Sequence, residues 1–310
     1  MELEVQQICK QYAQVQAINR LSFGVKKGEI FALLGPNGAG KSSLIRMLSG
    51  FTQADSGQIK VSINNRYYPF IPSHALGYLP EDRGLYPEKS VLKNIVYFAQ
   101  LNGVDKTAAI KEAKYWLERF DLLDRIDAQL KSLSKGNQQK VQLITAVIHQ
   151  PSWVILDEPF SGLDPINQEK VVQFLAELKA KGMTVILSAH QMAMVEKLAD
   201  RMLLLNKGQC VFYGTLHAIR QQAKVSGVLT AKFSENIDEK RITSLLKDSA
   251  YQLIDSHTLR INLSNQHVLN DLLLILPRLG ELVSLHSEKL DLHQLYLSAI
   301  ANHGEANSDK

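Results

Sequence analysis

A chain of 310 residues is long enough for one large domain with a sizeable core and a smaller appendage. Its composition, 45% hydrophobic and 21% charged residues, predicts a folded rather than a disordered protein. The formal net charge of +4 is mild and no strong basic run is present, so nucleic acid is not expected as a partner.

The two cysteines and the lengths of the apolar runs bear on where the protein is expected to work in the cell. Cys9 and Cys210 belong to no CxxC motif or His/Cys cluster, which argues against a zinc site or a disulfide framework and fits a reducing cytoplasm. The N-terminal residues are polar and acidic, unlike a secretory signal. No apolar run approaches the ~20 residues that cross a bilayer. Any work in the membrane is therefore expected from another chain.

Short apolar segments separated by helical patterns predict an α/β domain with buried parallel strands. The clearest are Ile30–Leu34, Trp153–Leu156, Val185–Leu187 and Met202–Leu205. One helix is expected from Ser42 to Ser49, stopped by Gly50. Another opens at Pro165 and is ended by Gly182. This core domain is expected to span residues 1–222.

A helical subdomain is expected to interrupt the core between about residues 85 and 150. Helix follows helix from Ser90, which caps a helix over Val91–Leu101. A second helix is expected from Asp105 to about Phe120.

The pattern changes again after residue 226. The order strand, helix, two strands, helix and strand predicts a small α+β, ferredoxin-like domain over residues 227–302. Its helices are expected at Ile237–Leu246 and His267–Leu279, with a closing helix through Tyr296. Residues 303–310 are expected to form a flexible tail.

A phosphate-binding loop is predicted between the first buried strand and the helix that follows it. Glycines let the backbone curl so that N–H groups point at phosphate oxygens, and the helix N-terminus adds its positive end. Lys41 would reach the β- and γ-phosphates of ATP and the Ser42 hydroxyl would ligate Mg²⁺. A glycine-rich turn without a ligand is the alternative, which the strand–loop–helix context disfavours. The candidate nucleotide-binding residues are Gly35, Pro36, Asn37, Gly38, Ala39, Gly40, Lys41, Ser42 and Ser43.

Two acidic residues follow the second predicted strand. An apolar strand that ends in a carboxylate places that charge beside the nucleotide crevice. Asp157 is expected to hold Mg²⁺, and Glu158 to orient and deprotonate the attacking water as general base. Two acids that merely cap the following loop would be the better interpretation if no phosphate loop were present.

Further segments give a resemblance to a known family. Leu133-Ser134-Lys135-Gly136-Asn137-Gln138-Gln139-Lys140 resembles the signature of ABC transporter ATP-binding subunits. Ser161-Gly162-Leu163-Asp164 resembles the D-loop of that family, and His190 its switch histidine. With the phosphate loop and the acidic pair, five motifs appear in the family's order between Met1 and about Gln222.

The resemblance implies a P-loop ATPase that forms a head-to-tail dimer, of two identical chains or close paralogues, around two ATP molecules. The Ser134 hydroxyl and the Gly136 N–H would contact the γ-phosphate held by the other chain, next to Asp164. His190 would contact the γ-phosphate or the attacking water, and Tyr12 would stack on adenine. As alternatives, Ser134 is an ordinary N-cap, His190 a structural histidine and Tyr12 an edge-strand residue.

Two positions depart from the family pattern. Lys135 replaces a glycine of the signature, while Gly136 is retained. Glu81 stands where glutamine is expected; its carboxylate can ligate Mg²⁺ beside the nucleotide but cannot donate hydrogen bonds as an amide does. Both departures, like the C-terminal domain, resemble the branch of sodium- and drug-efflux ATPases.

The resulting expectation is an ATP-hydrolysing subunit, peripheral on the inner face of the cell membrane, that energises export through a separate integral membrane permease. A non-transport soluble ABC ATPase is the alternative. Such proteins generally carry two cassettes, long coiled insertions or zinc motifs, and the sequence has one cassette and none of the others.

Overall fold

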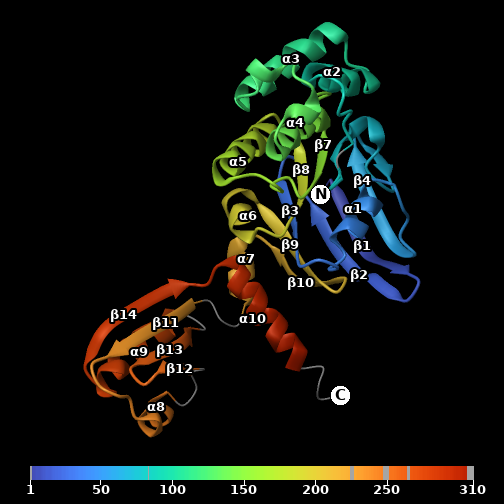
Figure 1. Cartoon of the computed structure of the whole chain (residues 1–310). Helices are drawn as coiled ribbons and strands as arrows, with labels where there is room; N and C mark the ends of the chain where they lie inside the picture. Colours follow the sequence, from blue (N-terminus) through green and yellow to red (C-terminus); the bar gives the residue numbers. More distant parts are fainter. Residues whose placement is uncertain (1, 83, 224–226, 247–250, 264–265, 306–310) are drawn as a thin grey trace. The chain divides into compact units, whose positions relative to one another are not determined.

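The computed structural model (Figure 1) describes residues 2–82, 84–223, 227–246, 251–263 and 266–305, with the backbone alone for 266–268 and 301–305. It divides into two compact units, Met1–Thr215 and Leu216–Lys310, and each is a fold in its own right. The division falls seven residues before the expected boundary at residue 222 (222 − 215).

The first unit is built on a six-stranded sheet with the order β10-β9-β3-β8-β7-β6. All of its strands are parallel except β10 at one edge. The strands β3, β7 and β8 are buried along their whole length, which explains their continuous apolar sequences. The bounds are β3 Ile30–Leu34, β6 Leu76–Leu79, β7 Trp153–Asp157, β8 Thr184–Ala189, β9 Arg201–Asn206 and β10 Gln209–Gly214.

A second, antiparallel sheet with the order β2-β1-β4-β5 belongs to the same unit and was not predicted. Side chains of this sheet, of α1 (Lys41–Leu48) and of the six-stranded sheet share one buried cluster, exemplified by Leu3, Leu44 and Phe31. The helix that follows the phosphate loop is thereby fixed by both sheets. The strands are β1 Leu3–Tyr12, β2 Val15–Val25, β4 Ser56–Ile63 and β5 Arg66–Tyr68.

The inserted helical region contains α2, α3 and α4, drawn in green in Figure 1. Ser90 accepts a hydrogen bond from the Lys93 N–H and Asp105 accepts one from the Thr107 N–H, so both act as caps. The helices and 3-10 turns of this region are α2 Val91–Leu101, α3 Lys106–Arg119, η2 Leu123–Arg125, η3 Leu130–Ser132 and α4 Lys135–Val147. Elsewhere in the first unit lie η1 Ser73–Ala75, α5 Pro165–Ala180 and α6 Met192–Leu198.

The second unit has the predicted order of strands and helices. Its sheet runs β12-β13-β11-β14, entirely antiparallel, and α8 and α9 contribute to one apolar core with it. This is the ferredoxin-like arrangement. The elements are α7 Leu216–Gln222, β11 Gly227–Phe233, α8 Glu239–Leu245, β12 Tyr251–Asp255, β13 Thr258–Leu263, α9 Gln266–Ile275, η4 Leu276–Arg278, β14 Leu282–Lys289 and α10 Leu292–Glu305.

The C-terminal end differs from the expectation. Residues 303–305, expected in a flexible tail, lie in the last turn of α10, and residues 306–310 lie outside the described residues. Within the part of the chain that the structure describes, no helix has the length and apolar character needed to cross a bilayer.

Candidate functional site

The loop between β3 and α1 has a backbone that only glycine can adopt at two positions. A Cβ atom at Gly35 would lie 2.3 Å from the Leu205 carbonyl oxygen, and one at Gly40 would lie 2.4 Å from that of Ala17. Gly40 is the N-cap of α1 with φ +106° and has no side chain to cap the helix. The first N–H groups of α1 therefore remain available for an anion.

Lys41 begins α1 and is directed back along the loop. Its Nζ donates to the carbonyl oxygens of Gly35, at 2.7 Å, and Pro36, at 3.2 Å, and only 7% of the residue is exposed. The next residue, Ser42, is exposed. The loop thus combines backbone donors, one cationic side chain and one hydroxyl.

Asp157 ends β7, and a neighbouring strand holds its carboxylate. The Ser188 hydroxyl on β8 donates to Asp157 Oδ1, in agreement with the register that pairs these two residues. Both residues are buried. A buried carboxylate held in one rotamer by a hydroxyl is a suitable ligand for a hard cation. No motif in the sequence marks Ser188.

Glu158 and His190 form a pair at the carboxyl ends of β7 and β8. His190 Nδ1 lies 2.8 Å from Glu158 Oε2, so Nδ1 donates to the carboxylate. The Glu158 N–H donates to the Ser188 hydroxyl at 3.1 Å and carbonyl at 3.2 Å. Glu158 also has φ +52°, a region that non-glycine residues seldom adopt and that recurs at functional sites.

The sheet order brings these groups into one row. The carboxyl ends of β3, β8, β7 and β6 are adjacent, and they carry the phosphate loop, His190, the Asp157–Glu158 pair and the segment with Glu81. Tyr78 on β6 lies close enough to Asp157 to be affected by its charge: burial raises the pKa of the Tyr78 hydroxyl most, and the Asp157 charge raises it further. The row lies where open parallel sheets bind ligands.

The Ser134 segment lies instead on the inserted helical region. Ser134 is the N-cap of α4 and accepts a hydrogen bond from the Asn137 N–H at 3.3 Å. A Cβ atom at Gly136 would approach the Gly162 carbonyl oxygen and Leu163 Cδ2 to 3.2 Å, so this glycine allows close packing against Gly162 and Leu163 of the same chain. The signature and D-loop segments are therefore neighbours within one subunit.

Asp164 is an N-cap rather than a free carboxylate. It accepts from the Asn167 backbone N–H at 2.9 Å and from the Asn167 side chain at 2.6 Å, and these bonds lower the pKa of Asp164. Its side chain thus fixes the start of α5.

Tyr12 borders a cavity of about 470 Å³ together with Arg46, Phe51, Thr52 and Tyr78. The tyrosine is 41% exposed at the end of β1, and Lys10 Nζ lies 5.4 Å from the centre of its ring. Its position at a cavity is compatible with stacking on a ring. The antiparallel sheet, and not the sheet of the phosphate loop, carries this tyrosine.

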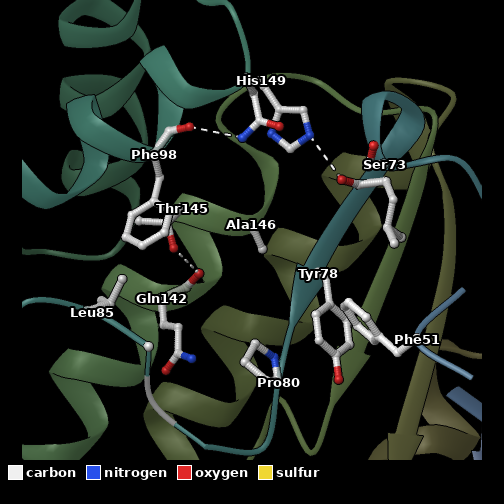
Figure 2. Close-up of a pocket in the computed structure, with 13 residues that line it drawn as sticks. Phe51, Ser73, Tyr78, Pro80, Leu85, Phe98, Gln142, Thr145, Ala146 and His149 are labelled. Carbon is white, nitrogen blue, oxygen red and sulfur yellow. Dashed lines mark hydrogen bonds between the residues drawn. The ribbon is translucent and has the colours of Figure 1, made fainter. Parts of the chain in front are cut away.

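A groove of about 330 Å³ lies between β6 and the inserted helices (Figure 2). We call it the lateral groove; its lining includes Phe51, Tyr78, Pro80, Phe98, Ala146 and His149. Gln142 of α4 also lines it, is almost fully buried, and donates to the Asp82 carbonyl oxygen at 3.3 Å. This bond connects the loop of Glu81 with the helix that begins after Ser134. Gln142 belongs to no motif that the sequence shows.

The chemistry of the row suits a nucleoside triphosphate with a divalent cation. Backbone N–H groups and Lys41 match phosphate oxygens, and the Ser42 hydroxyl and the buried Asp157 carboxylate offer oxygen atoms, the kind of ligand that Mg²⁺ prefers. Glu158, held by His190, can accept a proton from water.

Comparisons with known proteins agree with this chemistry. Residues 18–161 match the ABC transporter family. The chain is 33% identical over 309 residues to the ABC transporter ATP-binding protein YhaQ of Bacillus subtilis (strain 168), covering 96% of this chain and 98% of the relative. It is 33% identical over 220 residues to the Nod factor export ATP-binding protein I of Burkholderia lata, covering 70% and 72%.

A solved structure described as the ATP binding subunit of an ABC transporter superposes with a TM-score of 0.65 at 32% identity, over 72% of this chain and 93% of that chain. The predicted fold class, an α/β P-loop ATPase core with a small α+β domain, is thereby confirmed.

Proposed function

Because the chain belongs to the ATP-binding proteins of ABC transporters, and is therefore an ATPase of that family, we propose that two copies close head to tail around two ATP molecules. In this arrangement the closing and opening of the dimer drive substrate export through a separate membrane permease. The observation that supports it most is the division of the site residues between the sheet edge and the inserted helices.

The sheet edge supplies the hydrolytic half of the proposed site. Backbone N–H groups of the phosphate loop and of the first turn of α1 would bind the phosphates. Lys41 would leave the carbonyl oxygens of Gly35 and Pro36 and neutralise the phosphate charge. Ser42 and Asp157, with Glu81 as a further carboxylate, would hold Mg²⁺, which supplies charge neutralisation at the β- and γ-phosphates. Glu158 takes the proton of the attacking water, and His190 orients Glu158 through Nδ1.

The inserted helices supply the other half. Ser134 and Gly136 lie at the N-terminus of α4, where a hydroxyl, backbone N–H groups and the positive helix end all favour an anion. Because these two residues lie on the inserted helical region and not at the sheet edge that carries the phosphate loop, we assign the phosphate that they bind to the second copy. Each ATP then joins two subunits, and its hydrolysis removes that link.

The lateral groove is the surface that we assign to the permease. It is lined mainly by apolar side chains, and one of them, Phe51, is 65% exposed. A short amphipathic helix fits a groove of this kind. The Gln142–Asp82 bond would connect such a helix to both halves of the ATP site.

Export as the direction is supported by the relative named for Nod factor export and by the departures at Lys135 and Glu81. On this basis the protein would work at the inner face of the cell membrane. A soluble ABC ATPase without a permease is the alternative, and co-purification with ribosomes or DNA rather than with a membrane protein would favour it.

The test is the Glu158→Gln variant with ATP and Mg²⁺. We expect phosphate release to fall by about 10²–10⁴-fold, because the general base is lost, while ATP binding is retained and a dimer accumulates in gel filtration. A variant that hydrolyses ATP at the normal rate would remove Glu158 from this role. A hydrolysis-dead variant that stays monomeric with ATP would overturn the proposed dimer.

A further inference from the structure

A lysine ammonium is buried where three helices of the first unit meet. Lys140 lies on α4, less than two helical turns after the N-cap Ser134, and only 4% of it is exposed. Its Nζ donates to the Phe120 carbonyl oxygen at 3.3 Å, which is its only hydrogen bond among the residues that the structure describes. The chemistry assigned to the ATP site does not use this lysine.

The carbonyl oxygen that Lys140 contacts lies at the end of α3. Phe120 is the C-cap of α3, and the last carbonyl groups of a helix have no donor within it and carry partial negative charge. This end of α3 is held by α5, because the Phe120 ring packs on the Phe174 ring with centres 5.2 Å apart. Arg119 also donates to Glu177 of α5 at 3.0 Å. Lys140 therefore attaches α4 to a helix end that α5 already holds.

A carboxylate at the start of α5 is near enough to interact with the same ammonium. Burial lowers the pKa of the Lys140 ammonium, and the charge of Asp164, the N-cap of α5, acts in the opposite direction. Just before Asp164, Gly162 and Leu163 pack closely against Gly136 of α4. The ammonium thus interacts with both helices that begin at the segments assigned to the ATP of the other chain.

Stability alone does not explain why a charge is buried here. An ammonium that leaves water loses its hydration, and one hydrogen bond of 3.3 Å with one nearby carboxylate restores only part of that loss. Apolar residues of similar volume commonly replace buried charges without loss of stability, and methionine adapts well to irregular space. The lysine is better explained by what it fixes than by the stability that it adds.

We propose that Lys140 is a positioning residue for the ATP site of the other subunit. It fixes the N-terminus of α4 relative to the end of α3 and to residues 161–164, so that Ser134 and Gly136 meet the γ-phosphate of the partner's ATP in one geometry. Lys140 acts through α4 and makes no contact with nucleotide. The inference rests on the proposed head-to-tail dimer, in which these segments complete the site of the second copy.

The Lys140→Met variant separates positioning from folding. Its thermal unfolding, followed by tryptophan fluorescence, should occur at or above the temperature of the unmodified chain. Its affinity for ADP with Mg²⁺ should be unchanged, because ADP needs only the phosphate loop of its own chain. The kcat of ATP hydrolysis should fall by about 10- to 100-fold, since a small displacement of a positioned group has effects of this size.

Lys114→Met is the matched control, because it removes an exposed charge from α3 and should retain normal turnover. Normal turnover in Lys140→Met would overturn the proposal. A marked fall in its unfolding temperature, or an equal loss of ADP affinity and turnover, would also overturn it, because the role of the lysine would then be structural.

Mixing with Lys41→Ala shows on which site Lys140 acts. Each mixed dimer has one site in which both defects meet, and one that combines the phosphate loop of the Lys140→Met chain with the unmodified α4 of the other chain. An equal mixture should therefore reach up to about a quarter of normal ATP hydrolysis. A mixture no faster than the average of its components would show that Lys140 acts within its own chain, against the proposal.

A parallel mixture of Lys41→Ala with Ser134→Arg distinguishes failure of this inference from failure of the proposed function. Activity restored with Ser134→Arg but not with Lys140→Met would leave the shared site in place and refute the positioning role alone. Restoration in neither mixture would refute the shared site, and the inference with it.

Discussion

Replacing Ser188 by alanine tests whether the structure assigns the acidic pair correctly. The Ser188 hydroxyl donates to the buried Asp157 carboxylate and accepts from the Glu158 N–H. After the substitution the Glu158 N–H still has the Ser188 carbonyl oxygen as an acceptor. The main loss is therefore one hydrogen bond to a buried charged group, which contributes about 1.5–3 kcal/mol. Hydrolysis should fall as well, because the positions of Asp157 and Glu158 both depend on this serine.

Intrinsic fluorescence measures this loss in the relevant unit, because both tryptophans, Trp116 and Trp153, lie in Met1–Thr215 and are buried. At about 2–4 °C per kcal/mol for a unit of this size, thermal unfolding of Ser188→Ala should shift down by roughly 3–12 °C. Ser152→Ala, exposed just before β7, is the control and should change the unfolding free energy by less than about 0.5 kcal/mol.

An unchanged transition in Ser188→Ala, together with normal ATP turnover, would refute the reasoning. It would mean that Asp157 finds another donor or that its carboxylate does not depend on β8.

Two further predictions concern histidines. His190→Ala should lower the rate of phosphate release by about 10²-fold or more while leaving ATP affinity within a few fold, since its contact is with Glu158 and not with the phosphate loop; equal losses in rate and affinity would contradict this role. For His149, burial lowers the pKa of the imidazole, so the unfolded chain binds the proton more readily. Its contribution to stability is then present above the unfolded pKa of about 6.5 and is lost as pH falls below it. Urea unfolding between pH 7.5 and 5 should show a smaller loss in His149→Gln than in the unmodified chain, and identical slopes would contradict the prediction.

Sequence patterns predicted the elements whose signals are local. Ser90, Asp105 and Asp164 act as caps where the helices were expected to begin. The boundaries that moved have local causes too. Asp238 is an N-cap, so α8 begins at Glu239 and not at Ile237. Pro277 follows α9, and the chain continues there as a 3-10 turn instead of an α-helix.

The antiparallel sheet escaped prediction because its alternation is interrupted. β1 shifts register between Val5 and Ile8 and again before Lys10, and Gln7 has φ +48°. Each bulge moves the following side chains to the other face, so a pattern of period two does not persist.

The site was predictable only in part for a related reason. The residues of the phosphate loop and of the acidic pair follow one another in the chain, and the sequence shows them as motifs. The role of Ser188 depends on the register of β8 against β7, and that of Gln142 on the packing of α4 against the loop after β6. Both roles depend on contacts between segments that are far apart in the chain, so no short sequence motif indicates them.

ATP hydrolysis by a mixture of two inactive variants tests most directly whether each ATP site is shared between two chains. Lys41→Ala removes the phosphate-loop cation of one chain, and Ser134→Arg blocks the helix tip of the other. If each ATP lies between chains, a mixed dimer has one site with both defects and one intact site. Equal mixing should therefore restore up to about a quarter of normal ATP hydrolysis, because half of the dimers are mixed and each keeps one of two sites. A mixture that stays as inactive as its components would contradict the shared site.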